Sequence, residues 1–118
     1  MSISASDPVG ATLHAALDGL AYRQRVAADD IANVDTPNYT GHRVEFEDSL
    51  RSAVVNGTVG EGVTPQLLDD ERQAGANGNN VDLASETMTA MQATFSYQLL
   101  SRAVGDRYGL ITTAIGGM

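Results

Sequence analysis

Apolar side chains recur at helical spacing in two stretches of the chain, one near each end. The N-terminal stretch has intervals of four and three residues, the spacing of the packed face of a coiled-coil-like helix. Its positions are Leu13, Leu17, Leu20, Gln24, Ala27 and Ile31. Asp7 and Pro8 are typical of an N-cap and a first helical position, so a helix is predicted over residues 8–33. At about 1.5 Å per residue it would be roughly 39 Å long.

The C-terminal stretch predicts a second, longer helix over residues 82–116. One apolar stripe consists of Tyr97, Leu100, Val104, Tyr108, Ile111 and Ile115. An adjoining stripe, which makes the apolar surface broad, consists of Met88, Met91, Phe95 and Leu99. Asp82 is a candidate N-cap, and Glu86 would lie in the first turn near the positive end of the helix dipole. Gly116 and Gly117 are a natural end for this helix.

This second helix carries few charged side chains. Between residues 83 and 115 the charged residues are Glu86, Arg102, Asp106 and Arg107. A helix with one face in water normally keeps a well-charged outer surface. Serine, threonine, glutamine and alanine stand here where charges are expected. We therefore expect neighbouring molecules to bury this helix in an assembly.

The middle of the chain, residues 34–81, is different in kind. It predicts a loop, a short helix around EFEDSLRSAV, and Gly/Asn-rich turn signals in NGTVGEGVTPQ and AGANGNNVD. The segment VTPQLLDDER fits either a short strand or a turn of helix. The expected fold class is mainly α, with one domain over residues 1–118. Helices 8–33 and 82–116 would pack as a coiled-coil-like hairpin, and residues 34–81 would form an irregular outer insert.

The exit of the first helix, in DDIANVDTPNYTGHRVEFE, has the most distinctive sequence. Thr36-Pro37 is expected to end the helix, because the residue before a proline is displaced from the α region. Asn33 can cap the last carbonyls, and Asn38 tolerates a left-handed conformation. Tyr39 would fold back as an apolar anchor. We interpret this exit as fixing the direction in which the chain leaves the helix, through Ala32, Asn33, Thr36, Pro37, Asn38 and Tyr39.

Composition narrows the classes of function. A chain of 118 residues has room for one domain. Its formal net charge of −8, with every basic residue an arginine, disfavours nucleic acid and anionic membrane surfaces as partners. The lack of cysteine excludes disulfides and thiolate metal sites. No apolar run is long enough for a bilayer, and MSISASDPVG lacks the features of a secretory signal, so we expect neither membrane insertion nor a cleaved signal peptide.

Candidate catalytic and metal-binding residues are few. His14 and His42 are the two histidines, and neither stands in a metal-ligand spacing, so both are expected to be structural or surface residues. The stretch NGNNVDLASE places Asn77, Asn79 and Glu86 as in a calcium loop but lacks the acidic ligands. The sequence contains no nucleophile elbow, phosphate-binding loop or dinucleotide fingerprint. We expect no catalytic, metal or cofactor site, and therefore a protein that is not an enzyme.

The stretch ANVDTPNYT resembles the ANxxTPGY signature near the N-terminus of flagellar axial proteins, which are rod, hook and hook-associated subunits. Four blocks in order narrow the resemblance to the proximal rod proteins of the bacterial flagellar basal body. These blocks are LDGLAYRQRVAADDIANVDTPNY, RVEFEDSL, GNNVDLASE and YQLLSRAVGDRYGLITTAIGG. Asn38 stands where that family usually has glycine, and Thr87-Met88 follows Glu86 where a methionine more often comes directly.

The resemblance implies a structural role. Terminal helices of the family form the inner core of a hollow helical tube, and the middle segment lies outside. Subunits pass through the flagellar type III export apparatus into the periplasm. Expected partners are copies of the same chain, other proximal rod proteins, the rod-base adaptor protein, the membrane-embedded ring protein and the export gate.

Subunit contacts in such a rod, which would transmit torque, are expected from both helices. The expected contact residues are Leu13, Leu17, Leu20, Ile31, Tyr97, Leu100, Val104, Tyr108 and Ile111. An alternative function is a self-contained helical adaptor or export chaperone in the cytosol, which would be stable without partners.

Overall fold

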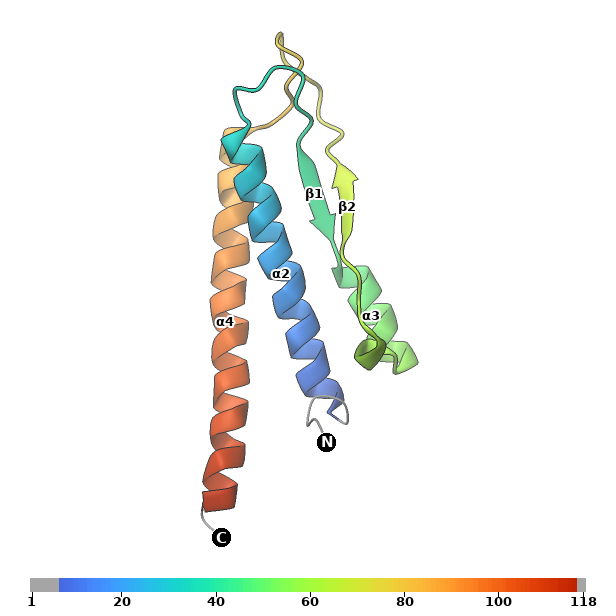
Figure 1. Ribbon diagram of the computed structural model, residues 1–118, viewed down its shortest axis with the longest axis vertical. Helices are drawn as coiled ribbons and strands as arrows, with labels where there is room; N and C mark the ends of the chain where they lie inside the picture. Colours follow the sequence, from blue (N-terminus) through green and yellow to red (C-terminus); the bar gives the residue numbers. More distant parts are fainter. Residues whose placement is uncertain (1–6, 117–118) are drawn as a thin grey trace.

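The computed structural model describes residues 7–116, and its two longest elements are the two predicted helices. α2 spans Pro8–Ala32 and α4 spans Leu83–Gly116. They run side by side in opposite directions and form an elongated hairpin (Figure 1). At about 1.5 Å per residue, α4 is roughly 14 Å longer than α2 and extends past the first turn of α2 (Figure 1). The mainly helical hairpin predicted from the sequence is thus confirmed.

The ends of both long helices lie within one residue of the predicted ends. Asp82 caps α4, because its carboxylate accepts hydrogen bonds from the backbone N–H groups of Ala84 (3.1 Å) and Ser85 (3.3 Å). At the other end α4 extends to Gly116, and Gly117 lies outside the described residues. α2 ends at Ala32, one residue before the predicted end at residue 33. The prediction that Thr36-Pro37 stops this helix agrees with that end, because a proline at position 37 removes the hydrogen bond to the Asn33 carbonyl and its ring clashes with that carbonyl.

The middle segment folds into a compact arm beside α2 (Figure 1). It contains strand β1 (His42–Glu45), helix α3 (Glu47–Asn56), the 3-10 turn η1 (Val59–Glu61) and strand β2 (Gln66–Asp69). β1 and β2 pair antiparallel, with His42 opposite Asp69 and Glu45 opposite Gln66. VTPQLLDDER therefore supplies a strand, which decides between the two conformations left open by the sequence.

A small core joins this arm to the helical hairpin. Its buried residues are Leu20 and Val26 from α2, with Val44 and Phe46 at β1. The Phe46 ring lies against Gly19, where an added Cβ would come within 2.6 Å of ring atoms. Partly buried side chains complete the core, namely Ala16, Tyr22, Leu50, Tyr97 and Leu100.

Gln24 is a polar residue in the packed face of α2, and it contacts the facing helix α4. Its side-chain amide donates a hydrogen bond to the Thr94 hydroxyl of α4, which satisfies a polar group within the helix pair. Across residues 7–116, the helices lack the combination of length and apolar character needed to cross a bilayer.

Candidate functional site

The exit of α2 is held by a local set of hydrogen bonds. The Asn33 side-chain amide donates to the Asp29 carbonyl at 2.8 Å, and its backbone N–H lies 3.1 Å from the carbonyls of Asp29 and Asp30. The Thr36 hydroxyl donates to the Asn33 side-chain oxygen at 3.1 Å. Asn38 has a φ of 61°, in the left-handed region. The roles expected for Asn33 and Asn38 in backbone geometry agree with the structure.

Asn79, a residue far along the chain, also forms hydrogen bonds with the exit of α2. Its buried side-chain amide donates to the carbonyls of Asn33 and Thr36, both at 2.8 Å, and its oxygen accepts from the Val81 N–H at 2.7 Å. The backbone N–H of Asn38 also donates to the Asn77 carbonyl at 2.9 Å. In the stretch considered as a calcium loop, the amide groups therefore form hydrogen bonds that hold the exit of α2 against the segment before α4.

Asp30 is a fully buried carboxylate at the end of α2, with a relative exposure of 0%. Tyr39 donates its hydroxyl to one Asp30 oxygen at 3.0 Å, and the His42 backbone N–H donates to the other at 3.0 Å. Burial, and then the Asp30 acceptor, raise the pKa of Tyr39 to about 12. Tyr39 folds back as predicted, but its anchor is this polar contact as well as its ring, because the hydroxyl needs a partner once buried.

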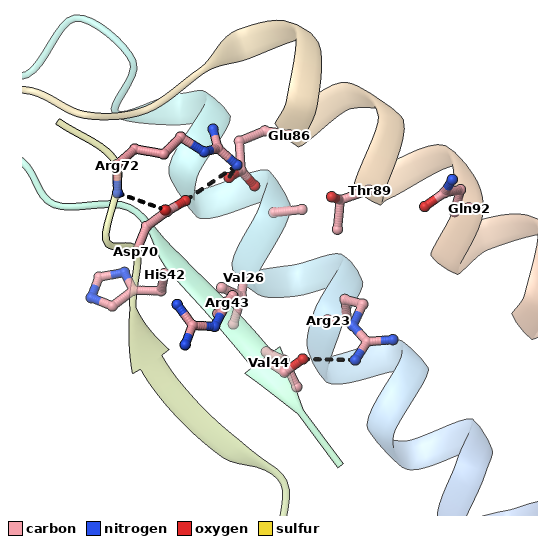
Figure 2. A pocket seen from close by; sticks show the side chains of 11 residues that line it. Arg23, Val26, His42, Arg43, Val44, Asp70, Arg72, Glu86, Thr89 and Gln92 are labelled. Carbon is pink, nitrogen blue, oxygen red and sulfur yellow. Dashed lines mark hydrogen bonds and ion pairs between the residues drawn. The ribbon is translucent and has the colours of Figure 1, made fainter. Parts of the chain in front are cut away.

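Glu86 brings a second carboxyl group to the same place from the first turn of α4, where its relative exposure is 3%. Figure 2 shows it beside Arg72, whose guanidinium lies 3.9 Å from a Glu86 oxygen and 3.2 Å from an Asp70 oxygen. Burial, and then the charge of Asp30, raise the pKa of Glu86 to about 7. The position of Glu86 in the first turn of α4, near the positive end of the helix dipole, was predicted, but the burial of its side chain was not.

A cavity of about 350 Å³ lies below this cluster, between α2, β1 and α4 (Figure 2). Its charged wall consists of ion-paired side chains such as Arg23, which donates to the Val44 carbonyl and to Glu47, both at 2.7 Å. The lining residues include neither serine nor cysteine. Within residues 7–116 no three histidine, aspartate or glutamate side chains are grouped as metal ligands.

Both histidines make contacts that account for them structurally. The His14 ring lies 3.3 Å from the Tyr108 hydroxyl, which links α2 to α4. The His42 ring lies between two carboxylates, 3.6 Å from Asp30 and 3.5 Å from Asp69, and packs edge-on against Tyr39.

The side chains predicted to form subunit contacts divide into two groups. Leu20, Tyr97 and Leu100 belong to the core of the chain itself, because they pack where the arm meets the hairpin. They are therefore largely covered before any partner binds. The other predicted contact residues are half-buried or exposed, namely Leu13, Leu17, Ile31, Val104, Tyr108 and Ile111.

The adjoining stripe of α4 remains uncovered in the single chain. We call it the outer face of α4. Its side chains expose more than half of their surface: Met88 58%, Met91 65%, Phe95 63% and Leu99 53%. Further along α4, Leu110 is 72% exposed and Ile115 67%. Contiguous exposed apolar side chains of this kind mark interaction surfaces.

An elongated hairpin with an uncovered apolar helix face is typical of a structural protein that packs against other subunits. The chain matches no protein family model. It is similar to the flagellar basal body rod protein FlgB of Borreliella burgdorferi, with 32% identity over 109 residues, covering 75% of this chain and 81% of that protein. The corresponding proteins of Borrelia hermsii and Bacillus subtilis are 31% and 27% identical, over 86% and 89% of this chain and 91% of each relative.

The chain belongs to the FlgB family of flagellar basal body rod proteins. It is therefore a structural component of the rod and not an enzyme, as predicted. Family membership also favours the rod subunit over the cytosolic adaptor or chaperone that the sequence left open as an alternative.

Proposed function

We propose that this chain is a subunit of the proximal rod whose outer α4 face is covered by helices of neighbouring subunits, and that torque passes between subunits through these packed helices. The observation that carries the proposal is the row of exposed apolar side chains on α4. Its neighbours would include copies of this chain, other proximal rod proteins, the rod-base adaptor, the membrane-embedded ring and, during assembly, the export gate. The rod would lie in the periplasm, with subunits delivered by the flagellar type III apparatus.

The outer face is chemically suited to helix packing. Between Met88 and Leu99 it carries no charged residue, so a neighbouring helix can cover it without desolvating an ion. Fully burying a side chain such as leucine, phenylalanine or methionine contributes about 1.5–3 kcal/mol. Four side chains that are more than half exposed would then contribute roughly 4–7 kcal/mol for each subunit added.

The arm and the exit of α2 would fix the geometry of each subunit. Core contacts and the Asn79 hydrogen bonds hold the arm against the hairpin, so a force applied to α4 reaches the rest of the chain. The residues at the exit, Ala32 to Tyr39, would determine where the arm lies relative to the tube. Residues 8–33 and 82–116 would form the tube core, and residues 34–81 its outer part.

A charge placed on the outer face tests this function. Phe95→Asp is expected to leave the circular dichroism spectrum of the purified subunit unchanged, because Phe95 is 63% exposed in the single chain. Inside the rod it would bury a carboxylate, so incorporation into detergent-washed basal bodies should fall at least tenfold and motility should be lost.

Phe95→Leu is the matched control, because it keeps an apolar side chain at the same position and should preserve both incorporation and motility. Normal incorporation of the Phe95→Asp subunit would overturn the proposal.

A further inference from the structure

Two buried carboxyl groups face each other across the contact between α2 and α4. Asp30 lies near the C-terminal end of α2, and Glu86 lies in the first turn of α4, close enough for the charge of Asp30 to raise the pKa of Glu86. Their relative exposures are 0% and 3%. Two carboxylates so close together in a dry site repel each other strongly, so such a pair is stable with one proton between them.

The donors and charges around the pair are unequally divided. Asp30 accepts hydrogen bonds from the Tyr39 hydroxyl and the His42 N–H, and the His42 ring is 3.6 Å away. Glu86 faces Arg72, but 3.9 Å is too long for a hydrogen bond, and Arg72 is closer to Asp70. The Asp70 charge also acts against ionisation of Glu86.

Two further cations of the neighbouring cavity are engaged elsewhere. Arg23 binds Glu47 at 2.7 Å, and Arg43 lies 3.2 Å from Glu45. Glu86 is therefore the carboxyl group of the pair with the weaker support for a negative charge.

We propose that Glu86 holds a proton that it donates to Asp30, and that this carboxyl pair is a pH-sensitive fastening between α2, the arm and α4. When the proton is lost to solvent, two carboxylates face each other in the buried contact. The first turn of α4 and the segment at Arg72 then separate more easily from the end of α2. The fastening lies within a single chain, so it does not depend on the proposed function.

The direction of the pH dependence follows from the raised pKa of Glu86, about 7 when folded against 4.5 as the ordinary value. The folded state binds the proton more tightly than the open state, so the stabilisation is complete below about pH 4.5 and declines as the pH rises towards 7. Above about pH 7 the stabilisation by this proton stays low. Since one proton is released, the equilibrium constant for opening can rise up to about tenfold per pH unit within this interval.

Hydrogen exchange on the full-length chain tests the fastening. The amide of His42 reports directly, because it donates to Asp30. After correction for the intrinsic effect of pH, its opening constant should increase at least tenfold between pH 5 and pH 8. Glu86→Gln keeps a donor at this position but cannot ionise, and it should remove most of this increase. A His42 amide whose corrected protection is the same at both pH values would overturn the proposal.

Two controls separate Glu86 from other titrating groups. Glu71→Gln removes an exposed carboxylate nearby and should keep the full pH dependence. Both variants retain His14 and His42, so a difference in pH dependence between the two variants comes from Glu86.

Carbon-13 NMR of the Glu86 carboxyl in the unmodified chain gives an independent readout. Its titration midpoint should lie near 7, and a midpoint near 4.5 would also overturn the proposal.

Discussion

Asn79→Ala tests whether one amide side chain holds the exit of α2 against the start of α4. The substitution removes three hydrogen bonds, to the carbonyls of Asn33 and Thr36 and from the N–H of Val81. A net contribution of about 1 kcal/mol for each gives a loss of about 3 kcal/mol, rising to about 5 kcal/mol if the carbonyls stay dry.

That loss is large for a chain of this size. A protein of 118 residues has a free energy of unfolding of roughly 6–18 kcal/mol, at about 0.05–0.15 kcal/mol per residue. The variant should therefore fold but unfold at a lower denaturant concentration. With a urea dependence of about 2 kcal/mol per molar, the midpoint should fall by about 1.5 M.

Urea unfolding followed by circular dichroism measures this shift. Asn56→Ala is the matched control, because Asn56 is exposed at the end of α3 and its loss should change stability by less than about 0.5 kcal/mol. Asn79→Asp keeps an acceptor for the Val81 N–H but loses both donors, so it should be at least as damaging as Asn79→Ala. If Asn79→Ala unfolds together with Asn56→Ala, the exit is not held in this way.

Two substitutions test other parts of the fold. Gly19→Ala should lower the free energy of unfolding by about 1–2 kcal/mol, because the new methyl group displaces the Phe46 ring. Gly105→Ala is the control, because the space around Gly105 is open and the change should be neutral or stabilising. Equal stability of the two variants in urea would contradict the close packing of Phe46 against Gly19. Pro37→Ala should leave the helix content unchanged, because α2 ends earlier at Ala32, and should cost about 0.4–1 kcal/mol through a freer unfolded chain. A gain in far-ultraviolet ellipticity would show instead that the proline is what ends the helix.

The long helices could be predicted because their signals are local. The four–three spacing after Pro8 and the cap at Asp82 are readable in a single stretch of sequence. β2 could not be assigned, because four residues carry too short a pattern and their strand conformation depends on pairing with β1, more than twenty residues away.

The candidate site could be predicted only where its contacts are local in the sequence. Asn33 and Asn38 act on nearby backbone, so residue type and position sufficed. Asn79 and Asp30 act across long sequence separations, and only the fold shows their partners. One signal was present for Asp30: an acidic residue in the last turn of a helix is disfavoured by the helix dipole, which indicates a specific partner.

Burial of the outer α4 face in the rod can be measured by cysteine labelling, because the chain has no cysteine of its own. Met91→Cys and Leu99→Cys would be treated with a maleimide, once as purified subunits and once in intact basal bodies. Dissolving the same basal bodies in denaturant gives the total thiol content as a control. We expect full labelling of the free subunits and at least tenfold slower labelling in basal bodies. Equal labelling rates in both states would show that neighbouring subunits do not cover this face.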